Sequence, residues 1–409
     1  MTDATRQGGL LAWIDARFPL SKMLREHVTE YYAPKNFNFW YYFGSFALLV
    51  LVIQIVSGIF LTMHYKPSAV DAFASVEYIM RDVPWGWLIR YIHSTGASMF
   101  FIVVYLHMFR ALLYGSYRGP RELLWIIGVL IYLVLMAEAF MGYILPWGQM
   151  SYWGAQVIIS LFGTIPLIGP GLAEWIRGDY FISDATLNRF FAYHVIALPL
   201  VLIALVAAHL QALHETGSSN PDGIEIKKVK GPDGNPADGI PFHPYYTVKD
   251  IMGGTVFLIF FAVVVFFMPE MGGYFLEHAN FVPANPLVTP DHIAPVWYFT
   301  PFYAMLRAIP HPFLGVVVMG AAVMILFLLP WLDRSPVNSI RYKGPITKVA
   351  LALFVVSFIG LGYLGLAPVT ELYTWIARVL TFIYFAYFIL MPWYSAIDRT
   401  KPVPQRVTS

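Results

Sequence analysis

The sequence predicts an all-α, polytopic membrane protein with eight transmembrane helices, on three observations. Of its 409 residues 58% are hydrophobic and only 12% are charged, far from the composition of a soluble globular domain. Eight apolar segments reach the roughly 20 residues that a helix needs to cross a bilayer. Cysteine is absent, which excludes disulfides, thiolate-held zinc or iron-sulfur clusters and covalent haem attachment through a CxxCH motif in this chain.

Residues 1–38 carry acidic side chains and lack the apolar core of a signal peptide, so we expect an amphipathic segment that forms a helix lying on the membrane surface. The predicted spans cover residues 39–63, 85–113, 123–145, 185–213, 249–269, 312–332, 346–366 and 371–393. Three connections are too long and too rich in Pro and Gly to be simple turns, namely 146–184, 214–248 and 270–311. We expect a four-helix bundle at 39–213 and a second four-helix part at 249–409.

An even number of spans places both termini on one side of the membrane. Most of the 26 lysines and arginines flank the spans on that side, and cytoplasmic flanks accumulate basic residues. We therefore predict cytoplasmic termini and a cytoplasmic loop 214–248, with loops 146–184 and 270–311 outside, in a bacterial inner membrane. The net charge of +2 and the lack of a basic tract with interleaved aromatics give no case for nucleic acid.

The second and fourth spans each carry two histidines, at a separation of 14 residues for His93 and His107 and 15 for His194 and His209. Fourteen helical residues advance about 21 Å and return to within about 40° of the starting face. Both spans run from outside to inside, which matches His93 with His194 and His107 with His209 by depth. Facing imidazoles are a bis-axial ligand set for haem iron. A single buried histidine is more often bonded to a carbonyl or part of a proton path, but four at matched depths favour two haems.

Glycines repeat the same spacing in the first and third spans. Gly44 and Gly128 fall at the inner histidine level, and Gly58 and Gly142 at the outer one. A residue without a side chain gives a large ring room to approach the backbone. The alternative is tight helix packing of the GxxxG kind, whose spacing neither pair has.

Two arginines lie three residues from a proposed ligand, Arg90 before His93 and Arg110 after His107. Each is placed to neutralise haem propionates. An arginine whose side chain extends to the lipid interface is an equally weighted alternative.

The separation of 15 residues in the fourth span would rotate His209 about 100° off the stripe of a regular helix. Pro199 lies between the two histidines and interrupts the hydrogen-bond ladder. We therefore expect a π-bulge near residues 195–199 to absorb the extra residue.

Five stretches carry a close resemblance to a known family: GASMFFIVVYLHMFR, MGYILPWGQMSYWGA, HETGSSNP, FHPYYTVKD and TPDHIAPVWYF. From about residue 30 to 395 the chain resembles the cytochrome b subunit of the cytochrome bc complexes, respiratory complex III. The resemblance implies ubiquinol:cytochrome c oxidoreductase activity and two non-covalent, bis-histidine haem b groups. It also implies a homodimeric complex, embedded in membrane lipid, with a Rieske iron-sulfur protein and a cytochrome c-type subunit as partners.

The resemblance further implies two quinone sites. The outer, quinol-oxidising site would use Phe140, Tyr143, Gly154, Pro295, Trp297, Tyr298 and Tyr303. The inner, quinone-reducing site would use Ser45, His214, Lys249 and Asp250. The residues themselves support the inner site. His214 lies one turn beyond His209, and Asp250 lies at the start of the fifth span on the same side. An imidazole and a carboxylate at this position can deliver protons to a reduced quinone. Interfacial polar residues without chemistry are the alternative.

One departure from the family concerns the outer site. Family members commonly have Pro-Glu-Trp-Tyr, with the glutamate as proton acceptor, whereas this chain has valine at position 296. The third span carries Glu138 in an otherwise apolar segment, inward of Tyr143, and such a carboxyl is usually functional. We hypothesise that Glu138 replaces the missing acceptor, so that Glu138→Gln slows quinol oxidation and keeps both haems. A protonated acid bonded to a backbone carbonyl is the alternative.

The mechanism implied by the family splits the two electrons of quinol. One passes to the Rieske partner, and the other crosses the membrane through both haems to a quinone at the inner site, coupled to proton translocation. Two other functions compete with this membrane electron-transfer role. A proton-coupled secondary transporter would explain polar residues at depth but not four histidines and four glycines at shared levels. A structural haem scaffold would not need the outer-loop motif.

Overall fold

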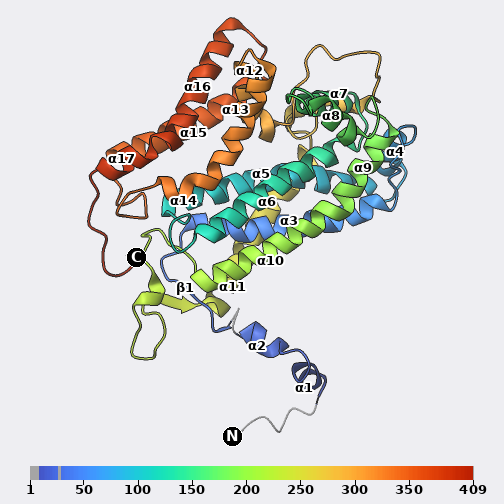
Figure 1. Ribbon diagram of the computed structural model, residues 1–409. Helices are drawn as coiled ribbons and strands as arrows, with labels where there is room; N and C mark the ends of the chain where they lie inside the picture. Colours follow the sequence, from blue (N-terminus) through green and yellow to red (C-terminus); the bar gives the residue numbers. More distant parts are fainter. Residues whose placement is uncertain (1–8, 26–28, 409) are drawn as a thin grey trace.

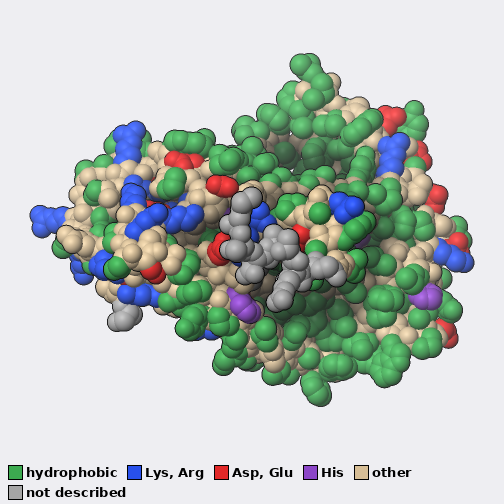
Figure 2. Space-filling model, turned by 90° about the horizontal axis from the view of Figure 1, so that it is seen from below, with side chains coloured by type: hydrophobic (Ala, Val, Ile, Leu, Met, Phe, Trp, Pro, Cys, Tyr) green, Lys and Arg blue, Asp and Glu red, His purple; other side chains and the backbone are tan. Residues whose placement is uncertain are grey.

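The computed structural model describes residues 9–25 and 29–408. Within these residues, eight helices are long and apolar enough to cross a membrane, which confirms the predicted number. They are Phe39–Thr62, Gly86–Tyr114, Glu122–Ile144, Asp184–Thr216, Phe242–Phe267, Pro312–Leu332, Pro345–Leu366 and Glu371–Ile389. Figure 2 shows wide hydrophobic areas, as a chain in contact with lipid requires, beside a part on the left where Lys and Arg side chains gather.

The first four spans run side by side as long helices (Figure 1). They consist of α3 (Tyr42–Thr62) after the 3-10 turn η2 (Phe39–Tyr41), α5 (Gly86–Tyr114), α6 (Glu122–Ile144), and α9 (Asp184–Ala192) continued through η3 (Tyr193–Ala197) into α10 (Leu198–Thr216). Helix α3 packs against α5, and α6 packs against α10. The bundle therefore consists of two helix pairs, each with one member that carries histidines.

The second group of spans lies beside this bundle (Figure 1). It consists of η5 (Phe242–Tyr246) with α11 (Thr247–Phe267), α13 (Pro312–Met324) continued by η9 (Ile325–Leu328) and α14 (Leu329–Leu332), α15 (Pro345–Leu366) and α16 (Glu371–Ile389), which α17 (Met391–Ile397) follows. Helix α11 packs on α3 and α5, and α15 packs on α16. The seam between the two groups is a large aromatic and aliphatic core.

The connections between the spans on the side of 146–184 and 270–311 contain short helices. They are α4 (Ala72–Arg81), α7 (Gln149–Phe162), α8 (Gly169–Arg177) and α12 (Thr300–Ala308), with the 3-10 turns η6 (Met271–Gly273), η7 (His278–Phe281) and η8 (Trp297–Phe299). Each is too short to span a bilayer. Helix α7 buries Ala155 and Ile159 and exposes Phe162, so it covers the ends of the spans with one apolar face. The helices within 146–184 and 270–311 agree with the expectation that these connections are more than simple turns.

The opposite end of the molecule joins the chain termini to the long polar loop (Figure 1). Strand β1 (Tyr32–Pro34) pairs antiparallel with β2 (Gly239–Pro241), a small sheet that the all-α prediction did not include. The 3-10 turn η4 (Ile226–Lys228) lies in the same loop. Arg406 forms an ion pair with Asp238 at 2.7 Å, and this hydrogen bond lowers the pKa of Asp238 to about 2. Strand β1, loop 214–248 and the carboxy-terminal segment around Arg406 therefore lie together at one end of the molecule.

The amino-terminal segment, expected as one surface helix, forms two short helices. They are α1 (Leu10–Asp15) and α2 (Leu20–Leu24), and they stand apart from the bundle (Figure 1). Leu10, Leu11 and Trp13 are exposed, so an apolar surface is available for lipid. Residues 1–8 and 26–28 of this prediction lie outside the described residues.

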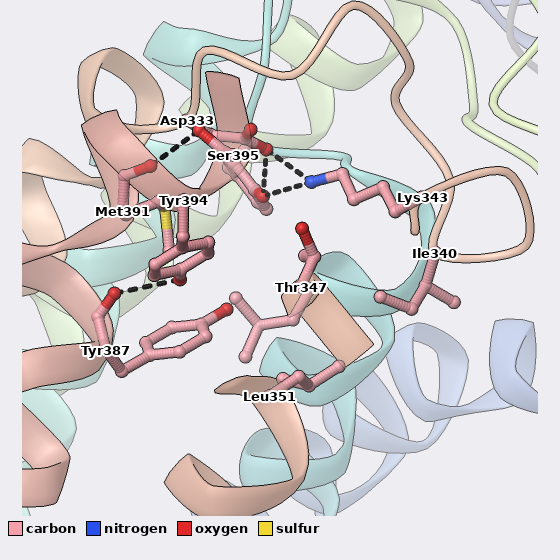
Figure 3. Close-up of a pocket in the computed structure, with 11 residues that line it drawn as sticks. Asp333, Ile340, Lys343, Thr347, Leu351, Tyr387, Met391, Tyr394 and Ser395 are labelled. Carbon is pink, nitrogen blue, oxygen red and sulfur yellow. Dashed lines mark hydrogen bonds and ion pairs between the residues drawn. The ribbon is translucent and has the colours of Figure 1, made fainter. Parts of the chain in front are cut away.

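A buried ion pair lies between α14 and α15, and a tyrosine that follows α5 connects it to the first helix group (Figure 3). Lys343 Nζ lies 2.5 Å from Asp333 Oδ2, and Tyr117 donates a hydrogen bond to the same oxygen at 2.6 Å. The lysine and aspartate side chains are only 4% and 1% exposed. Burial raises the pKa of Asp333, but the charges of Lys343 and Arg118 outweigh it and leave the pKa below its usual value. The carboxylate therefore anchors the segment before α15 to the end of α5.

Candidate functional site

The four histidines meet as two pairs, each formed by α5 and the fourth span. In the outer pair, the ring centroids of His93 and His194 lie 6.1 Å apart with planes at 88°. In the inner pair, those of His107 and His209 lie 6.3 Å apart with planes at 59°. Two imidazoles that share one metal ion through bonds of about 2 Å have centroids about 6 Å apart. Both pairs therefore fit one metal ion each, matched by depth as the sequence predicts.

Each pair provides two protein ligands. Among the residues that the structure describes, no group of three or more His, Cys, Asp or Glu side chains is placed to hold a metal. A metal at either pair must take its remaining ligands from another molecule, and a planar macrocycle between two axial imidazoles satisfies this requirement.

A π-helical segment brings His194 and His209 onto one stripe. It covers Tyr193–Ala197, and the backbone N–H of Leu198 donates to the carbonyl of Tyr193, five residues earlier. The wider turn absorbs the extra residue of the 15-residue spacing, and Pro199 follows in the first turn of α10, where its missing N–H is tolerated. The predicted bulge is confirmed, and it begins two residues earlier than expected.

The four glycines each face one of the four histidines. A Cβ placed on Gly44 would lie 3.4 Å from His107, and one on Gly128 would lie 3.3 Å from His209. At the outer level, a Cβ on Gly58 would lie 3.2 Å from His93 Cε1. A Cβ on Gly142 would lie 2.4 Å from Cε1 of His194. Each glycine therefore leaves room for the imidazole at the histidine level that the sequence predicts for it. Helix packing of the GxxxG kind does not explain why each glycine faces a histidine.

Gly142→Ala should weaken binding of the haem that the sequence predicts at the outer pair, because the added methyl group would displace the imidazole of His194. The haem absorbance per polypeptide of the purified protein measures this loss. Gly320→Ala is the matched control, since this glycine also lies in a membrane span and its Cβ would meet nothing within 4 Å. Full occupancy of both pigments in the Gly142 variant would contradict the assignment.

The two arginines differ in what the structure shows of them. Arg110 Nη2 lies 3.1 Å from His107 Nδ1, and its Nε is buried without a hydrogen-bond partner among the described residues. Such a buried donor fits an anionic group of a ligand. Arg90 lies one turn before His93 in α5, as the sequence places it.

Tyr143 lies at the centre of a polar cluster at the outer end of the bundle. Its hydroxyl donates a hydrogen bond to the carboxylate of Glu277, and the side-chain amide of Asn280 donates to the tyrosine oxygen at 3.0 Å. A Cβ on Gly154 would lie 3.7 Å from the Tyr143 ring. The outer loop 270–311 and the third span therefore meet here.

Glu277 is the site residue that the sequence analysis missed. Burial raises the pKa of its carboxyl to about 7, against the hydrogen bond from Tyr143, which lowers it. The loop also contains Glu270 and Asp291, and local sequence gives no sign of which acid turns inward.

The remaining residues of the predicted outer site gather around η8. Trp297 donates its indole N–H to Ser98 at 3.1 Å, and the ring of Tyr298 stacks on Phe101 with centroids 3.9 Å apart. Tyr303 donates its hydroxyl to the carbonyl of Ile293 at 3.1 Å. Pro295 precedes this group in the chain, and Phe140 packs instead against Phe190 of α9 with centroids 5.7 Å apart.

Glu138 points to the outer histidine pair. Its backbone carbonyl lies 2.9 Å from His194 Nδ1, and its side-chain Oε1 lies 3.1 Å from the same nitrogen. Glu138 and Gly142 are one turn apart on the face of α6 that points at His194, whereas Tyr143 lies about 100° further around the helix. Tyr143 has Glu277 as its carboxylate partner, and the hypothesis that Glu138 accepts the quinol proton stays a prediction.

The predicted inner site comes together in part. Ser45 donates a hydrogen bond to Oδ1 of Asp250 at 3.1 Å. Lys249 places its ammonium group 5.1 Å from the centroid of the Tyr246 ring. The ring of His214 packs against Tyr31, with centroids 4.7 Å apart. The structure therefore joins the serine and the aspartate directly, while the lysine and the histidine contact neighbouring aromatic residues.

Comparisons with known proteins point to one family over nearly all of the chain. The family model "Cytochrome b/b6/petB" matches residues 28–217, and "Cytochrome b(C-terminal)/b6/petD" matches residues 283–385. Cytochrome b of Allochromatium vinosum is 68% identical over 98% of both chains, and cytochrome b of Rickettsia prowazekii is 50% identical over 98% of both. A chain of "Hyperthermophilic respiratory Complex III" has a TM-score of 0.88 and 42% identity, covering 95% of this chain and 99% of that one.

Proposed function

The chain belongs to the cytochrome b family, and from this premise we propose that it is the membrane electron-transfer subunit of a quinol-oxidising respiratory complex III. One observation carries the proposal: two histidine pairs stand at two depths of one bundle, each pair with its two glycines. Two such histidine pairs would hold two redox groups at two depths of a membrane. A transporter does not need two redox groups.

The proposed cofactors are two haem b groups held without covalent bonds. His93 and His194 would hold the outer haem, and His107 and His209 the inner one. A bound haem supplies one-electron chemistry, while the protein supplies ligands, orientation and local electrostatics. Arg110 is proposed to turn its buried guanidinium from His107 to a propionate, and Arg90 to serve the outer haem in the same way.

The outer site is proposed to oxidise quinol, with Tyr143 and Glu277 as the polar groups that face the substrate. A quinol hydroxyl releases its proton more readily to a nearby carboxylate than to an apolar wall. Valine at position 296 cannot accept this proton, and Glu277 is the carboxylate that the structure places on Tyr143. The ring faces of Trp297 and Tyr298, with Phe140, Gly154, Pro295 and Tyr303, would line the rest of the site.

The inner site is proposed to reduce quinone and to take up protons from the opposite side. Asp250 receives a hydrogen bond from Ser45, so its carboxyl is held at the end of the bundle near the inner histidine pair. His214 lies in the last turn of α10 and Lys249 in the first turn of α11, at the same end of these spans. Both add groups that exchange protons with water. Separation of the two sites across the membrane would couple quinone chemistry to proton translocation.

The proposed partners follow from what this chain lacks. Without cysteine it cannot hold an iron-sulfur cluster or a covalently attached haem, so a Rieske protein and a cytochrome c-type subunit would supply them in a homodimeric complex. One relative, "Cytochrome b/c1" of Bradyrhizobium diazoefficiens, is 47% identical over 97% of this chain and 56% of its own length. Ubiquinone is the proposed substrate, and a bacterial inner membrane with cytoplasmic termini the proposed location.

A reduced-minus-oxidised optical spectrum of the purified complex tests the proposal. We expect two b-type bands that titrate separately, and quinol oxidation that is blocked by quinone analogues directed at either site. A colourless protein would remove the proposal, and coloured protein without sensitivity to the analogues would reduce it to a haem-binding scaffold.

A further inference from the structure

The two histidine pairs differ in the groups that face their Nδ1 atoms. In the outer pair, His194 Nδ1 lies between the carbonyl and the carboxyl of Glu138, at 2.9 and 3.1 Å, and His93 Nδ1 lies 3.0 Å from the hydroxyl of Ser57. In the inner pair, His107 Nδ1 faces the guanidinium of Arg110 at 3.1 Å. An acidic side chain therefore stands behind one ligand of the outer pair, and a basic one behind a ligand of the inner pair.

We propose that Glu138 is a positioning residue that sets the redox potential of the outer haem through His194. This inference rests on the proposed function, because it requires a haem at the outer pair. A backbone carbonyl alone is enough to orient an imidazole. The additional carboxyl oxygen therefore adds electron density to the ligand, beyond fixing its orientation.

The direction of the effect follows from the charges. An acceptor on Nδ1–H makes the imidazole a stronger donor to iron, which stabilises the oxidised metal and lowers the potential. Either protonation state of the carboxyl leaves an oxygen that accepts this hydrogen bond. A lower potential at the outer haem favours electron flow from the outer to the inner level, across the membrane.

The surroundings of Glu138 strengthen the interaction. The side chains of Glu138 and His194 are both only 16% exposed, and Oε2 of the glutamate is buried without a hydrogen-bond partner among the described residues. A polar contact is stronger in such an apolar environment than in water. Because Oε2 has no partner, His194 is the polar group that holds this carboxyl.

Glu138→Gln in the intact complex tests the proposal by redox titration. The replacement keeps the size of the side chain and weakens the acceptor. We expect the outer midpoint potential to rise while the inner one stays constant. Loss of a hydrogen-bond partner of a metal ligand typically changes metal affinity at least tenfold. A tenfold change confined to one oxidation state corresponds to ~59 mV for one electron. Glu138→Leu removes the acceptor and should move the potential further.

Glu277→Gln is the matched control, since it removes a buried carboxyl that contacts no proposed ligand. In this variant, the midpoint potentials of both haems should match those of the parent. Unchanged potentials in both Glu138 variants would overturn the inference. If those potentials stay constant while quinol oxidation slows, Glu138 is the proton acceptor that the sequence analysis hypothesised. A parent protein without b-type bands would instead remove the proposed function itself.

Discussion

His209→Leu should abolish the inner haem and leave the outer one in place, so that one of two b-type bands disappears from the spectrum. Leucine fills the space of the imidazole but offers iron no ligand, and the second histidine of the pair cannot hold a bis-axial haem alone. His93→Leu should remove the outer band in the same way. Because the pairs are separated along two helices, each variant should lose about half of the pigment and keep the other half.

His64→Leu provides the control for this experiment. This histidine is exposed just beyond the end of α3 and belongs to neither pair, so both bands should remain. A His93 or His209 variant with its full pigment content would refute the assignment of ligands, and the proposed electron path would fail with it. Haem extracted and counted per polypeptide gives the same answer independently of band shape.

Glu277→Gln should slow quinol oxidation by a factor of about 10² or more, since a positioned general base contributes roughly 10²–10⁴. The parent rate should also depend on pH. Burial raises the pKa of Glu277 to about 7, and only the ionised carboxyl accepts a proton. The rate should therefore fall as the pH is lowered through about 7 and level off above it, and the glutamine variant should lose this inflection.

Steady-state quinol oxidation between pH 5.5 and about 9, across the range where such a group titrates, measures both effects. Glu270→Gln is the control in the same loop, because that acid is exposed and pairs with His278 at the surface. Its rate and pH profile should match those of the parent. Normal turnover of the Glu277 variant, combined with slow turnover of Glu138→Gln, would transfer the role of acceptor to Glu138.

Helical periodicity made much of the site predictable. The spacing of His93 and His107 defines one face of one helix, and the same spacing in Gly44 and Gly58 marks the helix that packs against it. The π-helical segment of the fourth span was also predictable, because one extra residue before His209 and a proline in the same segment require a wider turn. Glu138 lies four residues before Gly142, so helical periodicity also places it on the histidine face, and its role as a proton acceptor stays a prediction.

The sequence by itself determined the eight spans, the two histidine pairs and their glycines, because each depends on composition or on a repeat within one helix. Only the tertiary structure decided that Glu277 meets Tyr143, that Asp333 pairs with Lys343 and that the outer connections fold into helices on the ends of the bundle. Hydrogen bonds between distant segments depend on how the helices pack, and no local period in the chain records that packing.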